Sequence, residues 1–210
     1  TLNRLGRAED TDILYITDHG DMMGNLGMAF KGPFHTDDLM RLPLIWRPAR
    51  SAGISAPSEI TDPVGQIDLA PTLCEIAGLP VPEWMDGTPL PLADGTERGP
   101  VTCVYDSKIP GVGMHLRTVY DGGWICTAYL PSTVGQPTGL EKLVGPQVLD
   151  SYGVEYAGTE GELYNVADDP HQWNNLWDDP AHRARRSEML ELLHDALPTQ
   201  GRYLPVVAIA

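Results

Sequence analysis

An acid, an imidazole and a lysine occur close together near the start of the chain, in "ITDHGDMMGNLGMAFKGPF" (residues 16–34). Asp18 and His19 could offer a carboxylate oxygen and a ring nitrogen to one divalent cation. Oxygen ligands suit Ca²⁺, Mg²⁺ and Mn²⁺, whereas an imidazole shifts the preference toward Mn²⁺, Zn²⁺ or iron. Neighbouring side chains in a strand point to opposite faces, so both reach one ion only if the chain turns, which Gly20 allows. On spacing alone, a loop Asp beside a hydrogen-bonded His is the simpler interpretation.

Lys31 adds a side-chain ammonium to the same stretch. A lysine ammonium is a mobile point charge that could stabilise the negative charge developing on a phosphoryl or sulfuryl group during its transfer. A lysine in a loop is, however, usually a surface residue. The residue types alone leave these two interpretations equal.

Two short strands must position these side chains. Residues 12–17, "DILYIT", are nearly all apolar, as expected for a strand of a parallel sheet that is covered on both faces. The strand stops at Asp18, and ligands of open α/β sheets gather beyond the carboxyl ends of strands. A second strand is predicted at 42–46, "LPLIW", with a short helix at 36–40 between the two.

The segment "QIDLAPTLCEIAGLP" (residues 66–80) has the pattern of a helix. Asp68 is predicted to be its N-cap, Pro71 lies in the first turn, where its missing N–H is harmless, and Gly78 follows the end. The helix should pack on the sheet through apolar residues on one stripe. These are Leu69, Leu73, Ile76 and Ala77.

A boundary between two parts of the chain is predicted in residues 80–100, which are rich in proline and glycine. Residues 1–98 would then belong to the α/β domain and residues 99–210 to a small C-terminal subdomain. Within the second part the apolar period changes to two at 101–106, 115–130 and 161–166, which predicts an antiparallel meander. The "DGG" at residues 121–123 is a hairpin turn signal within it.

The last predicted element is a helix from Asp179 to Leu197, with Asp179 as the cap and Pro180 at the first position. It should bury Met189, Leu193 and Leu197. The remaining charged residues are most simply a solvated face. These are Arg183, Arg185, Arg186, Glu188 and Glu191.

Length and charge restrict the class of protein. The 210 residues, 42% of them apolar and 20% charged, are enough to bury a substantial core. The formal charge of -15 argues against nucleic-acid and anionic-membrane partners. A small anionic substrate remains possible, because a metal ion can reverse the sign of the electric field within one pocket.

No apolar run is long enough to span a bilayer. Because residue 1 is Thr, the chain looks cut from a longer one.

The cysteines indicate neither a zinc ribbon nor a disulfide scaffold. Cys74, Cys103 and Cys126 are odd in number, far apart and without C-x-x-C spacing, so we expect them to be small apolar fillers in strands and a helix. The lack of paired cysteines favours the cytoplasm weakly, with a periplasmic or secreted location left open.

Three segments, in order, resemble the signature stretches of the sulfatase family within the alkaline phosphatase superfamily. They are "DILYITDHGDMMGNLGMAFKGPFHTDDLMRLPLIWRP", "QIDLAPTLCEIAGLPVP" and "GELYNVADDPHQWNNL". The resemblance covers most of the chain. It implies an α/β fold, namely the C-terminal part of an alkaline-phosphatase-like α/β/α sandwich, followed by a small antiparallel sheet with a C-terminal helix.

The resemblance also implies roles for individual residues. Asp18 and His19 correspond to ligands of one divalent metal ion, Ca²⁺ or Mn²⁺, and Lys31 to the lysine that contacts the sulfate or phosphate group. Many arylsulfatases have Asn where this chain has His19. The Asp-His pair is similar to the branch with phosphonate monoester hydrolases, phosphodiesterases and choline-sulfatase-like enzymes, and imidazole favours Mn²⁺.

The family's nucleophile is absent from this chain. Family members carry a Cys or Ser, in a C/S-x-P-x-R signature, that is converted to formylglycine. None of the three cysteines here has that context. The formylglycine is therefore expected upstream, the isolated chain is expected to be inactive, and a two-ligand half-site should hold metal weakly.

Two further histidines are candidates for substrate binding. His35 follows the lysine and could face the pocket, although a structural role beside Asp37 and Asp38 is equally open. His115, with Arg117, lies in the C-terminal meander, which in such folds leans over the rim of the active site.

Several functions remain open. The first is metal-dependent hydrolysis of small-molecule sulfate esters by the full-length protein, and the second is hydrolysis of phosphonate monoesters or phosphodiesters. A non-catalytic module without a nucleophile is a third. A metal-dependent phosphatase or phosphomutase with a Ser or Thr nucleophile is a fourth. The "ELYN…NNL" block argues against this fourth function. A homo-oligomer is left open.

Overall fold

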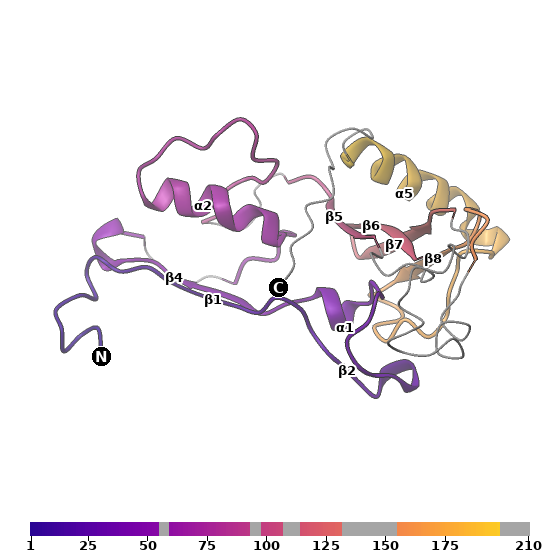
Figure 1. Cartoon of the computed structure of the whole chain (residues 1–210), viewed down its shortest axis with the longest axis horizontal. Helices are drawn as coiled ribbons and strands as arrows, with labels where there is room; N and C mark the ends of the chain where they lie inside the picture. Colours follow the sequence, from indigo (N-terminus) through magenta and orange to yellow (C-terminus); the bar gives the residue numbers. More distant parts are fainter. Residues whose placement is uncertain (55–58, 93–97, 107–113, 132–154, 198–210) are drawn as a thin grey trace, which may run out of the picture. The chain divides into compact units, whose positions relative to one another are not determined.

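The computed structural model describes residues 1–54, 59–92, 98–106, 114–131 and 155–197 (Figure 1). The contacts within the chain divide it into two compact units. The first comprises Thr1–Met23, Ala29–Lys31 and Asp38–Arg98, and the second comprises Gly24–Met28, Gly32–Asp37 and Gly99–Ala210. The assignment of residues 1–98 to a catalytic domain and 99–210 to a subdomain stays a prediction.

In the first unit, β1 (Ile13–Ile16) pairs with β4 (Leu44–Arg47), close to the two predicted strands. The pairing is antiparallel, with Tyr15 opposite Ile45. The expectation of a parallel strand is therefore wrong for this pair. An apolar run indicates that a strand is buried, but it carries no information about the direction of the neighbouring strand.

The β1–β4 pair buries its two faces unequally. Ile13, Tyr15 and Ile45 are 42%, 60% and 62% exposed, while Leu14 and Ile16, which alternate with the first two in β1, are half-buried. Side chains alternate between the faces of a strand, so the exposed residues share one face. Within the described residues, that apolar face lacks a covering layer.

The predicted helix at 66–80 forms as a 3₁₀ turn, η3 (Gln66–Asp68), that continues into α2 (Leu69–Ile76). Asp68 occupies the N-cap position of α2, as predicted, but its side chain makes no capping hydrogen bond to that helix, because the added turn gives it helical dihedrals. Its carboxylate instead accepts hydrogen bonds from the backbone N–H of Gly65 (3.0 Å) and of Thr88 (2.8 Å). The predicted N-cap position is thus confirmed, but the carboxylate binds Gly65 and Thr88 instead of the first turn of α2.

Between β1 and β4 the chain forms a small hairpin and a short helix. Strands β2 (Met22–Met23) and β3 (Ala29–Phe30) pair antiparallel around the 3₁₀ turn η1 (Asn25–Gly27). The predicted helix at 36–40 is present as α1 (Asp37–Met40). A further 3₁₀ turn, η2 (Arg50–Ala52), follows β4.

The second unit contains the predicted meander. Strands β5 (Val101–Asp106), β6 (His115–Asp121), β7 (Trp124–Tyr129) and β8 (Gly161–Asn165) form an antiparallel sheet in that order. The turn between β6 and β7 contains Gly122 and Gly123, both with positive φ, as the "DGG" signal predicted.

Helix α5 (Arg183–Ala196) covers one face of this sheet (Figure 1). The 3₁₀ turn η4 (Pro180–His182) leads into it, and the Asp179 carboxylate accepts from the N–H of Ala181 (2.9 Å), which confirms the predicted start. The core beneath the helix is apolar and buried. Its residues are Val119, Cys126, Leu163, Trp177, Met189 and Leu193.

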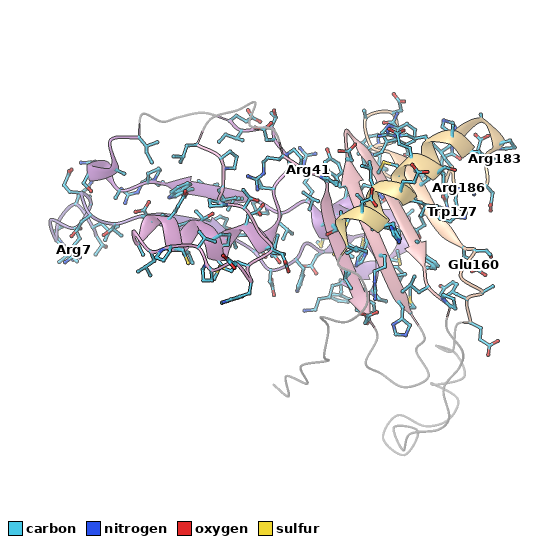
Figure 2. The ribbon with its side chains drawn as sticks, turned by 90° about the horizontal axis from the view of Figure 1, so that it is seen from above. Arg7, Arg41, Glu160, Trp177, Arg183 and Arg186 are labelled. Atoms are coloured by element: carbon cyan, nitrogen blue, oxygen red, sulfur yellow. The ribbon has the colours of Figure 1, made fainter. Side chains whose placement is uncertain are left out.

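Two arginines of α5 are not part of a solvated face, contrary to the prediction. Arg185 and Arg186 are only 24% and 26% exposed in their side chains. Their guanidinium groups lie 5.3 Å and 5.1 Å from the ring centroids of Trp124 and Trp177, respectively. Figure 2 shows Arg186 beside Trp177. The flat, weakly hydrated guanidinium group stacks on an indole face, which periodicity within the helix does not reveal.

The three cysteines are free thiols in α2, β5 and β7, as predicted. Burial raises the pKa of the Cys126 thiol to about 12, so this cysteine behaves as a small apolar core residue. Among the described residues, none of the helices has the length and apolar character that crossing a bilayer requires.

Candidate active site

The side chains of Asp18, His19 and Lys31 come together at the carboxyl end of β1. Nε2 of His19 lies 2.8 Å from Nζ of Lys31 and 3.7 Å from Oδ2 of Asp18. Lys31 returns to this point because the β2–β3 hairpin folds back on itself immediately before it. The structure therefore brings together the three residues that the opening stretch singled out.

The hydrogen-bond partners of His19 determine its tautomer. Nδ1 lies 2.8 Å from the carbonyl oxygen of Gly20, which can only accept a hydrogen bond. The ammonium of Lys31 can only donate, so Nε2 must accept from it. His19 is thus a neutral imidazole that carries its proton on Nδ1 and directs the lone pair of Nε2 toward a cation.

The Asp18 carboxylate is exposed and ready to bind a cation. Its Oδ1 accepts hydrogen bonds from the backbone N–H of His19 (3.1 Å) and the hydroxyl of Thr17 (3.3 Å). The pKa of Asp18 is lowered, chiefly by a hydrogen bond from its own backbone N–H and further by those from the His19 N–H and the Thr17 hydroxyl. These interactions keep the carboxyl group ionised.

Gly20 lets the chain turn tightly after the two ligands. Its N–H donates to the carbonyl of Leu39 (3.0 Å), and a Cβ at this position would lie 1.8 Å from the carbonyl oxygen of Asp38. No side chain fits at that distance. The sequence analysis expected Gly20 only to permit a turn, and the structure adds that the close approach of α1 leaves no room for a side chain here.

Gln66 is a residue of this site that the sequence did not indicate. Its side-chain nitrogen donates to the backbone carbonyls of Thr17 (2.9 Å) and Asp18 (3.0 Å). A glutamine at the start of a helical turn carries no chemical signature, and 48 residues separate it from Asp18. Only the fold could reveal this contact.

The donor set fits two ligands of a divalent cation. The Asp18 carboxylate supplies oxygen, and the Nε2 lone pair of His19 already faces the positive charge of Lys31. The described residues contain no group of three or more His, Cys, Asp or Glu side chains that could hold a metal ion. The end of β1 is thus suited to be half of a metal site.

His35 lies in the core of the second unit and is only 7% exposed. Its Nδ1 lies 2.7 Å from the hydroxyl of Thr118, and its Nε2 lies 3.5 Å from Sγ of Cys103. Burial, and secondarily the charge of Arg117, lowers the pKa of His35 to about 4. Both ring nitrogens thus face core groups of the second unit, and the substrate contact of His35 stays a prediction.

His115 and Arg117 share one carboxylate on β5. Nδ1 of His115 and Nη1 of Arg117 both lie 2.9 Å from Oδ1 of Asp106. Burial raises the pKa of Asp106, but hydrogen bonds from Arg117 and His115 outweigh it and leave the pKa lowered. This partly exposed ion cluster is where the structure places the predicted His115, whose role in substrate binding stays a prediction.

Known proteins resemble the chain along most of its length. No family model matches it. The choline-sulfatase of Rhizobium meliloti is 38% identical over 102 residues, which are 47% of this chain and 19% of that protein. The uncharacterised sulfatase YidJ of Escherichia coli is 30% identical over 193 residues, which are 91% of this chain and 32% of that protein. The chain thus spans about a third or less of these curated relatives.

Solved structures agree with this comparison. The phosphonate monoester hydrolase of Agrobacterium radiobacter matches with a TM-score of 0.65 and 25% identity, over 93% of this chain and 37% of that one. Sulfatase structures match with TM-scores of 0.66 and 0.68. The α/β fold expected from the sequence is therefore confirmed. Over the part that it spans, the chain belongs to the sulfatase family of the alkaline phosphatase superfamily.

Proposed function

We propose that this chain supplies one side of the active site of a metal-dependent hydrolase of sulfate esters. The observation that carries the proposal is the convergence of Asp18, His19 and Lys31 at the end of β1. An exposed carboxylate, a neutral imidazole and an ammonium there combine two potential metal ligands with one positive charge. Membership of the sulfatase family points to the sulfuryl group as the one transferred.

The chemistry requires a nucleophile from another part of the protein, proposed to be a formylglycine in its hydrated form. When present, it would supply a hydroxyl oxygen that bonds to sulfur as the bond from sulfur to the alcohol oxygen breaks, and the released proton would be taken up by the alcohol. Negative charge shifts among the sulfuryl oxygens during this exchange. The Lys31 ammonium would lie against those oxygens and stabilise the charge.

The metal ion would be held by Asp18 and His19 together with ligands from outside this chain. When bound, it supplies Lewis-acid stabilisation of the ester oxygens. An imidazole ligand suits Mn²⁺ better than Ca²⁺, which prefers oxygen. We therefore propose Mn²⁺ before Ca²⁺.

A second candidate is hydrolysis of phosphonate monoesters or phosphodiesters. Two observations favour it, namely a histidine, His19, directly after Asp18 and the likeness to a phosphonate monoester hydrolase. The ligands and the lysine would have the same roles, because phosphoryl and sulfuryl groups present similar tetrahedral sets of oxygens.

The test is an assay of the complete protein that contains this chain, supplied with Mn²⁺ or Ca²⁺. An aryl sulfate, a phosphonate monoester and a phosphodiester are the substrates. Faster turnover of the sulfate supports the first proposal, and faster turnover of either phosphorus ester supports the second. No turnover of any substrate with metal present would contradict both and favour a non-catalytic module.

A further inference from the structure

We propose that Gln66 is a positioning residue that fixes the backbone from which the Asp18 and His19 side chains project. This inference rests on the proposed metal site and deepens it. The hydrogen bonds of Gln66 lead to the two carbonyls just before His19. Gln66 would thus set the relative placement of the two ligands without touching the metal ion.

The two carbonyls lie where the strand pairing has ended. The last paired residue of β1 is Ile16, opposite Leu44 of β4. The next two carbonyls, of Thr17 and Asp18, both accept from the amide nitrogen of Gln66, at 2.9 Å and 3.0 Å. A side-chain amide has two N–H donors, so one group can serve both carbonyls. Gln66 therefore satisfies two backbone carbonyls that the strand pairing leaves unpaired.

Gln66 is itself attached to a rigid support. It begins η3, whose last residue, Asp68, is buried. The Asp68 carboxylate accepts from the N–H of Gly65 (3.0 Å) and from the guanidinium of Arg98 (2.7 Å). The side chains of Asp68 and Arg98 are each only 8% exposed. The backbone of the turn that carries Gln66 is thus held by a buried ion pair between Asp68 and Arg98.

The backbone that Gln66 holds determines how the ligands point. The turn after β1 places Oδ2 of Asp18 and Nε2 of His19 3.7 Å apart, with Nε2 also 2.8 Å from Nζ of Lys31. Groups that orient metal ligands typically alter metal affinity by about 10- to 100-fold when they are removed. Loss of the Gln66 hydrogen bonds should have an effect of this size, because both ligand residues gain backbone freedom.

The test is Mn²⁺ binding by the complete protein, measured from the EPR signal of free Mn²⁺. Gln66→Met keeps the length of the side chain but removes both donors, and we expect the Kd for Mn²⁺ to rise about 10- to 100-fold. Gln66→Asn, which is one methylene shorter, should cause a similar rise. The control is Ile67→Met on the same turn, where the side chain is exposed and should leave the Kd unchanged.

The outcomes separate the inference from the proposed function. If the wild-type protein binds Mn²⁺ and both Gln66 variants bind it equally well, Gln66 has no positioning role. A lower melting temperature without metal, together with an unchanged Kd, would indicate a structural role only and would also overturn the inference. If the wild-type protein binds no Mn²⁺, the metal site itself fails, and the inference fails with it.

Discussion

Nζ of Lys31 lies 2.8 Å from Nε2 of His19 and donates a hydrogen bond to it. The contact joins the lysine expected to bind the substrate to the histidine expected to bind the metal. It also defines the tautomer of the ring, because Nδ1 donates its proton to the carbonyl of Gly20 and Nε2 accepts from Lys31 through its lone pair. The polar residues at the end of β1 therefore form one connected group rather than a set of separate loop side chains.

Replacement of Lys31 tests its electrostatic role. Lys31→Met in the complete protein should lower kcat for an aryl sulfate by about 10²- to 10³-fold, the usual cost of losing one charge-stabilising donor in an active site. Steady-state kinetics measures this. Arg7→Met removes a cation from an exposed ion pair with Asp10 and serves as the control, which should retain full activity. Equal activity of both variants would exclude the role.

Replacement of His19 by Asn tests the metal preference. An amide oxygen is a harder ligand than an imidazole nitrogen, so His19→Asn should raise the affinity for Ca²⁺ relative to Mn²⁺. Competition between the two ions, followed through the EPR signal of free Mn²⁺, measures the ratio. An unchanged ratio would mean that His19 does not contact the metal.

Gly20 should tolerate no side chain. In Gly20→Ala the new Cβ would meet the carbonyl oxygen of Asp38 at 1.8 Å, so the backbone must shift. We expect a loss of about 1–3 kcal/mol in the free energy of unfolding, as for other overpacked sites. Urea denaturation measures it. Gly99→Ala is the control, because a Cβ there meets nothing within 4 Å, and comparable losses in both variants would contradict the explanation.

The buried His35 should make stability depend on pH. Its pKa is about 4 in the folded chain, against an ordinary value of 6.5, so the unfolded chain binds more protons between these values. Stability should therefore fall as the pH drops from 6.5 to 4, by at most about 3 kcal/mol from this group. Urea denaturation across this range measures the slope. His35→Gln should flatten it, and an identical slope in the variant would refute the assignment.

The buried ion pair between Arg98 and Asp68 should contribute strongly when one partner is removed. Arg98→Met leaves the Asp68 carboxylate buried without its charge partner, which should cost about 3–5 kcal/mol. The matched control is Arg50→Met, whose partner Glu9 is 66% exposed in its side chain, and the expected cost is below about 1 kcal/mol. Thermal or urea unfolding distinguishes the two, and equal losses would show that burial of the pair has no effect.

Local sequence patterns predict where helices and strands form in this chain better than they predict which elements and side chains contact one another. The period-two runs and the Asp179–Pro180 start are local features, and the meander and α5 formed where they indicated. The antiparallel pairing of β1 with β4, and the stacking of Arg185 on Trp124, depend on residues distant in the chain. The spacing of apolar residues indicates neither of these contacts.

The candidate site shows the same difference. Asp18, His19 and Lys31 could be predicted because their chemistry is distinctive and they lie in one short stretch. Gln66 could not be, because an amide that bonds to backbone carbonyls resembles any other polar surface residue. The ion pair of Asp68 with Arg98 could not be predicted either, because 30 residues separate the two in the chain.

The most direct test of the metal site is a crystal structure of the complete protein with Mn²⁺, using anomalous scattering at the manganese edge. We predict one anomalous peak within about 2.6 Å of both a carboxylate oxygen of Asp18 and Nε2 of His19. Lys31 should then lie beside the ion without being a ligand. A manganese peak that contacts neither side chain, or the absence of a peak from this site, would contradict the account.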